Sequence, residues 1–296
     1  MLEKLKSPEI VKPSKPKFML SGDPGVGKTF FALSFLKPVF VDIESGGTRE
    51  QYQKKLKESG GVYFGRDDGA NDFAEVIKLV KGLTTEKHEY KTLILDSVSH
   101  LYLTEAAIAE ETIGNDFGKD KKAANKPTRQ LLRWLENLDM TVILIAHAKQ
   151  AWERKGSEVI NVGTTFDFYE KASFSLDLWC EILKGGKNFV VRKSRIESLP
   201  QGSTFPLAYE KFAELYGREV MESSSVPVGM ATEAQVKRIK ELITALNVPA
   251  EQIQKWYKKV NAEEWEDMTS IQITSLTDML NKKILELNLN NGKDIK

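Results

Sequence analysis

The sequence has little of several features that would place it in a special class. It contains one cysteine, Cys180, in 296 residues, which excludes a disulfide within the chain and fits a reducing compartment. No apolar run approaches the roughly 18 residues of a membrane-spanning helix, and the N-terminal stretch lacks the apolar core of a signal peptide. The net charge is only +1, so a nucleic-acid site would have to be a local basic patch. We therefore expect a cytoplasmic protein with no membrane contact.

The composition is otherwise that of an ordinary globular protein, with 41% hydrophobic and 29% charged residues. The length allows one large domain and a small one. We expect an N-terminal arm over 1–16, a core over 17–221, a linker over 222–230, a helical module over 231–287 and a polar tail over 288–296. The Lys- and Pro-rich arm is expected either to be disordered or to pack on a neighbouring subunit.

The clearest motif follows a short apolar run at 18–20 and spans Gly22-Asp23-Pro24-Gly25-Val26-Gly27-Lys28-Thr29. It matches the phosphate-loop pattern G-x-x-x-x-G-K-[ST]. The glycines let the backbone fold closely around phosphates, and a helix expected from Phe30 adds a partial positive charge. Lys28 would reach the β- and γ-phosphates, and Thr29 would hold Mg²⁺ through its hydroxyl. Residues 22–30 are therefore predicted to bind ATP.

Two later strands are expected to end in carboxylates at the same edge of the sheet as this loop. The strand at 92–96 ends in Asp96, the Walker B pattern, and Asp96 would bind Mg²⁺ through water. The strand at 38–44 ends in Glu44, which could orient and deprotonate the attacking water. The alternative for Glu44 is a solvated acid at a strand end. Ser97, and not a glutamate, follows Asp96, which favours Glu44 as the base.

A strongly β-branched strand at 141–147 ends in His147, where the γ-phosphate would lie. We expect His147 to sense that phosphate, although a lone histidine is more commonly an ordinary surface or core residue.

Two polar loops are candidates for contact with nucleic-acid phosphates and bases. The first, about 113–126, supplies Lys119, Lys121 and Lys122. The second, about 148–166, supplies Trp152, Arg154 and Lys155, partly offset by acidic neighbours. The alternative in both cases is a solvated surface loop.

Strands at 174–183 and 188–191, joined by Gly185-Gly186, are expected to form a hairpin that ends in basic residues. Its cations, including Lys193 and Arg195, either keep an exposed edge strand from pairing with another chain or reach the ATP of an adjacent subunit. In the second case they would act like an arginine finger, worth about 10³–10⁵ in rate.

The helical module is marked by two capping boxes, Thr232 with Gln235 and Thr269 with Gln272. Residues 231–296 carry equal numbers of acidic and basic residues (ten each), which favours a partner-docking role over a grip on DNA.

In this order the motifs resemble the RecA-like P-loop ATPases over roughly residues 15–220, and more narrowly the phage-encoded, RecA-like single-strand annealing proteins of the Sak group. The resemblance implies an α/β fold with a mostly parallel central sheet, plus the C-terminal helical module. It implies that Glu44 is the catalytic glutamate and that His147 replaces a residue that is usually glutamine. It also implies DNA loops near 113–126 and 148–166, Lys193 and Arg195 at a subunit interface, and a ring or filament.

We therefore expect an ATP- and Mg²⁺-dependent protein that binds single-stranded DNA and promotes annealing or strand pairing. One alternative is a nucleotide-gated assembly or helicase-loader protein that recruits a replication or single-strand-binding protein through 231–287. A small-molecule P-loop kinase is a further alternative, which the Asp-Ser pair at 96–97 and the basic hairpin disfavour.

Overall fold

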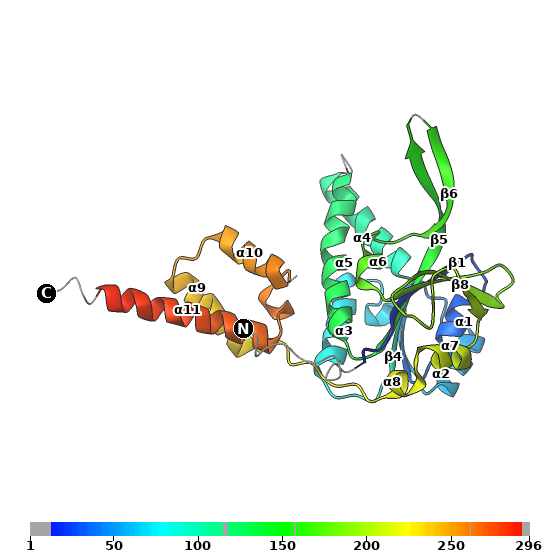
Figure 1. The fold of residues 1–296 in the computed structure, drawn as a ribbon, viewed down its shortest axis with the longest axis horizontal. Helices are drawn as coiled ribbons and strands as arrows, with labels where there is room; N and C mark the ends of the chain where they lie inside the picture. Colours follow the sequence, from blue (N-terminus) through cyan, green and yellow to red (C-terminus); the bar gives the residue numbers. More distant parts are fainter. Residues whose placement is uncertain (1–12, 115–117, 157, 261, 292–296) are drawn as a thin grey trace.

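The computed structural model describes residues 13–114, 118–156, 158–260 and 262–291. A nine-stranded sheet lies at its centre, with helices on both faces (Figure 1). The strands are β1 (Lys17–Gly22), β2 (Pro38–Asp42), β3 (Val62–Phe64), β4 (Thr92–Asp96), β5 (Thr141–Lys155), β6 (Glu158–Phe166), β7 (Leu178–Ile182), β8 (Asn188–Ser194) and β9 (Thr204–Pro206). The spatial order is β3-β2-β4-β5-β1-β7-β8-β9, and β6 pairs with β5. Strands β1 to β5 and β7 pair in parallel within the sheet, which confirms the predicted mostly parallel α/β fold.

The helices of the core are α1 (Lys28–Ala32), α2 (Glu50–Glu58), α3 (Phe73–Thr85), α4 (Val98–Ile113), α5 (Lys119–Asn137), α6 (Ala172–Ser175), α7 (Tyr209–Tyr216) and α8 (Arg218–Glu222). A short 3-10 turn, η3 (Arg66–Asp68), lies between β3 and α3. Helix α3 is capped by Asp72, whose side chain accepts hydrogen bonds from the amides of Ala74 and Glu75. None of the described helices is both long and apolar enough to cross a lipid bilayer.

Side chains of the central strands alternate between two buried layers, because successive residues of a strand face opposite sides of the sheet. In β4, Leu93 and Leu95 pack with α3, α4 and α5, whereas Ile94 packs on the opposite face with α1, α2 and α7. Strands β1, β2 and β5 divide their apolar residues in the same way. Helices thus cover both faces of the central strands, which favours the ends of these strands as a place for a ligand.

The parallel register brings the carboxyl ends of β1, β2, β4 and β5 to one edge. Asp42 lies opposite Asp96, and Gly22 lies opposite His147. The phosphate loop, Glu44 and Ser97 follow directly after these strands. This edge is therefore where the predicted site residues can meet.

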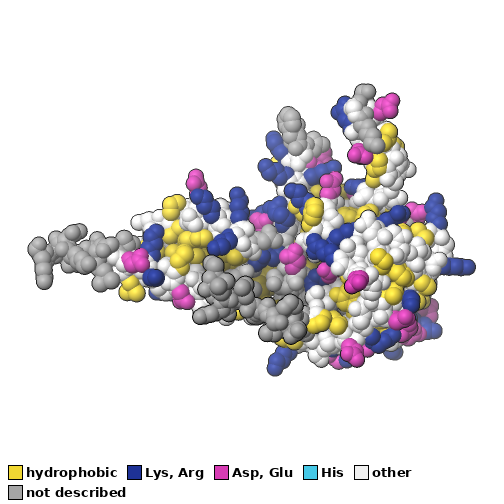
Figure 2. All heavy atoms as spheres, in the orientation of Figure 1, with side chains coloured by type: hydrophobic (Ala, Val, Ile, Leu, Met, Phe, Trp, Pro, Cys, Tyr) yellow, Lys and Arg dark blue, Asp and Glu magenta, His cyan; other side chains and the backbone are white. Residues whose placement is uncertain are grey.

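Two structures project from that edge of the sheet (Figure 1). Strand β5 continues past His147 and pairs with β6 as a long antiparallel hairpin, so the predicted loop at 148–166 is instead a β-hairpin. Helix α5 begins at Lys119, so most of the other predicted loop, 113–126, is helical; residues 115–117 lie outside the described part of the chain. Lys119, Lys121 and Lys122 occupy the first turns of α5, and Figure 2 shows basic side chains around this projecting end.

The C-terminal helices are α9 (Glu233–Ala245), α10 (Ala250–Val260) and α11 (Ser270–Asn291), with a 3-10 turn, η5 (Trp265–Asp267), between the last two. They share their own apolar cluster, which includes Ile239, Trp265 and Ile273. Both predicted capping boxes are present, because each threonine hydroxyl and its partner glutamine accept one another's backbone N–H.

The turn η5 fastens these helices to the core. Asp267 is fully buried and accepts hydrogen bonds from Trp134 Nε1 at 2.7 Å and from Gln130 Nε2 on α5. Glu264 pairs with Lys81 of α3 at 2.9 Å. The C-terminal helices are therefore attached through η5 to α3 and α5, two of the helices that cover one face of the sheet.

The segments expected to be an arm and a linker are held by the core where they are described. Lys15 is 1% exposed, and its ammonium donates to the carbonyls of Asp139 and Ser223 at 3.0 and 2.9 Å. Within 222–230, the amide of Val228 donates to the carbonyl of Thr84. Residues 1–12 of the arm and 292–296 of the tail lie outside the described residues, and 288–291 belong to α11.

Candidate nucleotide-binding site

The phosphate loop joins β1 to α1 and keeps the open backbone that its sequence predicts. Gly25 and Gly27 have φ values of 79° and 97°, a left-handed region that favours glycine. The Lys28 ammonium donates to the carbonyls of Gly22 and Asp23, at 2.9 Å each. Burial lowers the pKa of Lys28, and the carboxylates of Asp96 and Glu44 act in the opposite direction. Lys28 is therefore held inside the loop, at the place where phosphates would bind.

Thr29 and Asp96 meet at the end of β4. The Thr29 hydroxyl donates to Asp96 Oδ2 at 2.6 Å. Burial raises the pKa of Asp96 to about 6, opposed by the hydrogen bond from Thr29. The structure thus joins the two residues that the sequence predicted as metal ligands.

Glu44 lies two residues beyond β2 and contacts Ser97, which follows β4, and His147, which lies within β5. Ser97 donates a hydrogen bond to Glu44 Oε1, and His147 Nε2 lies 2.8 Å from the same oxygen. The Glu44 side chain is 36% exposed and that of His147 48% exposed. Both groups can therefore be reached by a bound molecule.

The turn after Glu44 is fixed by Asp42, which is buried. Its carboxylate accepts from the amides of Gly46 and Gly47 at 3.0 and 2.8 Å and from the Tyr63 hydroxyl at 2.8 Å. A side chain at Gly47 would lie 2.4 Å from the Phe40 ring, so glycine is required for this close approach. Asp42 therefore positions Glu44 through the turn.

These groups surround a cavity of about 480 Å³, within the usual size range of small-molecule sites. Its lining includes most of the residues that the sequence predicted for binding and hydrolysing ATP within one chain: Gly22, Pro24, Gly25, Lys28, Thr29, Glu44, Asp96 and His147. Asp23, Val26, Gly27 and Phe30, also predicted, do not line it. The Phe30 ring is half exposed and lies under Lys55.

The cavity also contains residues that the sequence analysis missed. Arg49 is the residue that precedes α2, and Tyr52 lies in the first turn of that helix. Asp42, Gly46 and Ala148 complete the wall. No sequence pattern predicts Arg49, because its position at the cavity depends on the conformation of the turn that Asp42 fixes.

The residues present fit a magnesium-nucleotide. Among the described residues, no group of three or more His, Cys, Asp or Glu side chains could hold a metal ion by itself. Mg²⁺ in nucleotide sites commonly takes only one or two protein ligands and completes its shell with phosphates and water. The adjacent Thr29 hydroxyl and Asp96 carboxylate supply such a pair.

The other predicted residues lie away from this cavity. Arg154 and Lys155 lie near the end of the β5–β6 hairpin, and Trp152 is 59% exposed on the same strand. On β8, Lys193 donates to the carbonyl of Leu176, and just beyond the strand Arg195 donates to that of Phe174 at 2.5 Å. That these two cations act on a neighbouring subunit's nucleotide stays a prediction.

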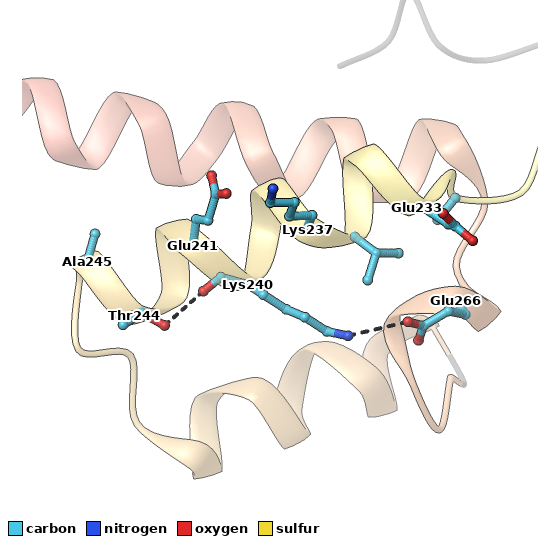
Figure 3. A pocket seen from close by; sticks show the side chains of 9 residues that line it. Glu233, Lys237, Lys240, Glu241, Thr244, Ala245 and Glu266 are labelled. Atoms are coloured by element: carbon cyan, nitrogen blue, oxygen red, sulfur yellow. Dashed lines mark hydrogen bonds and ion pairs between the residues drawn. The ribbon is translucent and has the colours of Figure 1, made fainter.

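A larger cavity, about 820 Å³, lies among the C-terminal helices. Figure 3 shows Lys240 of α9 reaching across it toward Glu266, at 3.4 Å. Its lining consists mainly of one face of α9, with Ala231 and Glu266 from outside that helix, and combines charged with apolar side chains. It has no counterpart of the converging Lys28, Asp96 and Glu44, so we place the chemistry at the edge of the sheet.

A glycine-rich loop between a buried strand and a helix, facing carboxylates at the ends of parallel strands, defines a P-loop nucleotide-binding protein. The model of the AAA domain family matches residues 14–183, which is more than half of the chain and includes the whole of the cavity. The chain belongs to the AAA domain family and has a P-loop ATPase domain, of the kind that binds and hydrolyses nucleotides and typically uses Mg²⁺. A comparison with curated proteins finds no match.

Proposed function

We propose that this protein is an ATPase stimulated by single-stranded DNA that promotes annealing or strand pairing, as in RecA-like phage recombination proteins. The observation that carries the proposal concerns His147. It contacts Glu44 in the nucleotide cavity, and its carbonyl accepts the amide of Asp167 where the β5–β6 hairpin leaves the sheet. One residue thus belongs both to the nucleotide site and to the root of a projecting hairpin.

In this proposal each residue of the cavity has a defined task. Lys28 exchanges its carbonyl partners for the β- and γ-phosphates, and Thr29 and Asp96 hold Mg²⁺, which neutralises phosphate charge when bound. Glu44 accepts a proton from the attacking water. His147 changes its contact with Glu44 when a γ-phosphate is present and so shifts the hairpin.

The DNA would be bound by the two structures that project from the same edge. The start of α5 offers Lys119, Lys121 and Lys122, and the hairpin offers Trp152 and Arg154. Cations bind the backbone of a single strand, and an aromatic ring stacks with its bases irrespective of sequence. Assembly into a ring or filament would place several such surfaces along one strand.

ATP turnover, with and without single-stranded DNA, tests the proposal. Lys28→Ala should lower turnover by about 10²-fold or more, as loss of a phosphate-binding donor does. Glu44→Gln should lower it by about 10²–10⁴-fold, as loss of a general base does, while keeping nucleotide affinity. The exposed residues Lys57 and Glu58 of α2 provide the matched controls Lys57→Ala and Glu58→Gln, which should behave as wild type. DNA-independent turnover that Glu44→Gln leaves unchanged would contradict the proposal.

A second candidate is a nucleotide-gated loader that hydrolyses little ATP and recruits a replication partner. It is favoured by apolar side chains exposed on α11, where Ile271 is 79% and Met279 49% exposed. Slow turnover that DNA does not change, together with partner binding abolished by Ile271→Glu, would select this function instead.

A further inference from the structure

A second groove lies beside the nucleotide cavity, on the other side of the hairpin root. Its volume is about 650 Å³. It is formed by three segments: the lower hairpin, the α6 region, and the neighbouring strands β7 and β8 with the loop that follows. The lining residues are Lys149, Gln150, Ala151, Trp152, Thr165, Phe166, Glu170, Ser173, Trp179, Arg192, Lys193 and Gln201. Residues that the sequence placed in two unrelated roles, Trp152 and Lys193, therefore share one groove.

The two tryptophan side chains of the groove differ in how tightly they are packed. Trp179 is fixed: its Nε1 donates to Ser21 Oγ at 2.7 Å, and its ring meets that of Phe166 edge to face, with centroids 5.1 Å apart. Trp152 is instead 59% exposed. A fixed aromatic wall with a second, exposed indole at its mouth is suited to a flat aromatic ligand such as a nucleobase.

Three cations line the same groove against one acid, Glu170. Two of the cations already have carboxylate partners, since Lys149 pairs with Asp167 at 2.9 Å and Arg192 with Glu181 at 2.6 Å. Lys193 contacts a backbone carbonyl, and burial together with nearby Arg195 lowers its pKa. An anion beside Lys193 would relieve this unfavourable environment, so Lys193 is the group best placed to receive a phosphate.

We propose that this groove binds one nucleotide unit of single-stranded DNA, with its base stacked on Trp152 and its phosphate beside Lys193. The inference rests on the proposed function and narrows it to one site. The hairpin root is a wall common to both cavities: Ala148 lines the nucleotide cavity and Lys149 lines the groove. A strand bound in the groove would therefore press on the segment that carries His147.

The proposal gives Lys193 and Arg195 different tasks, although they are two residues apart. Lys193 lines the groove, whereas Arg195 does not. If both served the nucleotide of a neighbouring subunit instead, removing either charge would affect ATP turnover and leave DNA affinity unchanged. The two readings can thus be separated in one set of variants.

The experiment measures binding of a fluorescein-labelled oligo(dT) to the full-length chain by anisotropy, over a series of salt concentrations. Trp152→Ala should raise the Kd by between about 5-fold and 150-fold, the range for one stacked base. Trp152→Phe, which keeps an aromatic face, should recover most of the affinity. Val159→Ala is the matched control, because Val159 is exposed on the same hairpin but lies outside the groove.

Lys193→Gln should weaken binding and reduce the slope of log K against log salt by about 0.7, the value for one phosphate of a single strand. Arg195→Gln should leave both unchanged. If the wild-type chain binds the oligonucleotide and neither Trp152→Ala nor Lys193→Gln weakens this binding, the groove is not the binding site. The proposed function would still stand. A wild-type chain that does not bind the oligonucleotide, with or without ATP, would overturn both.

Discussion

His147 Nε2 and Glu44 Oε1 lie 2.8 Å apart, across the ends of two strands that are separated by β4. Ser97, at the end of β4, donates to the same Glu44 oxygen. The carboxylate that would activate water is thus contacted by a residue that follows the adjacent strand β4 and by a residue of β5, the next strand along. Under the proposed function, a γ-phosphate that draws His147 away would alter the environment of the base and the position of the hairpin root together.

The first prediction concerns this contact. His147→Ala should make the basal and DNA-stimulated ATPase rates nearly equal, because the connection between Glu44 and the hairpin is lost. The stimulation that disappears, which is the ratio of the DNA-stimulated rate to the basal rate in wild type, should lie within the range of about 5- to 150-fold that is usual for coupling between sites. His147→Gln should retain stimulation, since a glutamine amide can still donate to Glu44. Equal stimulation in wild type and His147→Ala would refute this coupling.

The second prediction follows from the buried Asp96. Its pKa is raised to about 6 from an ordinary 3.8, so the folded, ligand-free protein holds this proton more tightly than the unfolded chain. The contribution of Asp96 to stability is therefore most favourable below pH 4 and is lost as the pH rises through 6. At 1.36 kcal/mol per pKa unit, the change is about 3 kcal/mol.

Asp96→Asn removes this pH dependence and can still accept the hydrogen bond from Thr29. In buffer containing a chelator, the variant should therefore gain stability relative to wild type between about pH 4.5 and pH 7.5. Urea unfolding at the two pH values measures the difference. A stability difference that is the same at both would show that Asp96 does not titrate in this range.

Segments that have a buried face could be predicted from the sequence, whereas segments that project from the core could not. The apolar runs of β2, β4 and β5 predicted buried strands, and the residues that end these runs, Glu44, Asp96 and His147, lie at one edge of the sheet as predicted. The β5–β6 hairpin was mistaken for a loop because beyond His147 it leaves the core, so exposed residues such as Trp152 and Val159 interrupt the usual alternation of apolar and polar side chains.

The first half of α5 was missed for a related reason. Its early turns are rich in lysine, and Pro127 lies inside the helix, a combination that is typical of a loop. The helix is held there by tertiary contacts, with Ala124 buried and Tyr102 donating to Asn125 at 3.1 Å. Such contacts come from distant parts of the chain and leave no local pattern.

The third prediction concerns the attachment of the C-terminal helices. Asp267→Ala should lower the free energy of unfolding by about 3 kcal/mol, the upper end of the cost of one unsatisfied buried donor, because Trp134 and Gln130 lose their acceptor. It should also expose residues 222–230 to protease. Asp278→Ala, on the exposed side of α11, is the matched control and should change stability by less than about 0.5 kcal/mol. Identical unfolding midpoints for the two variants would contradict this role for Asp267.

The last prediction uses two adjacent glycines in the turn between β7 and β8. Gly185 and Gly186 both have positive φ, 93° and 64°, so alanine at either position should cost about 1–2 kcal/mol of stability. Their surroundings differ: a Cβ at Gly186 would lie 2.7 Å from the carbonyl oxygen of Val26 in the phosphate loop, whereas one at Gly185 would meet nothing within 4 Å. Gly186→Ala should therefore displace the phosphate loop and weaken binding of Mg²⁺-ATP, while Gly185→Ala should lose stability but keep its affinity. Calorimetric titration of both variants with a non-hydrolysable ATP analogue distinguishes the two effects. Equal affinities would mean that the loop accommodates the added methyl group and that the hairpin turn does not support the phosphate site.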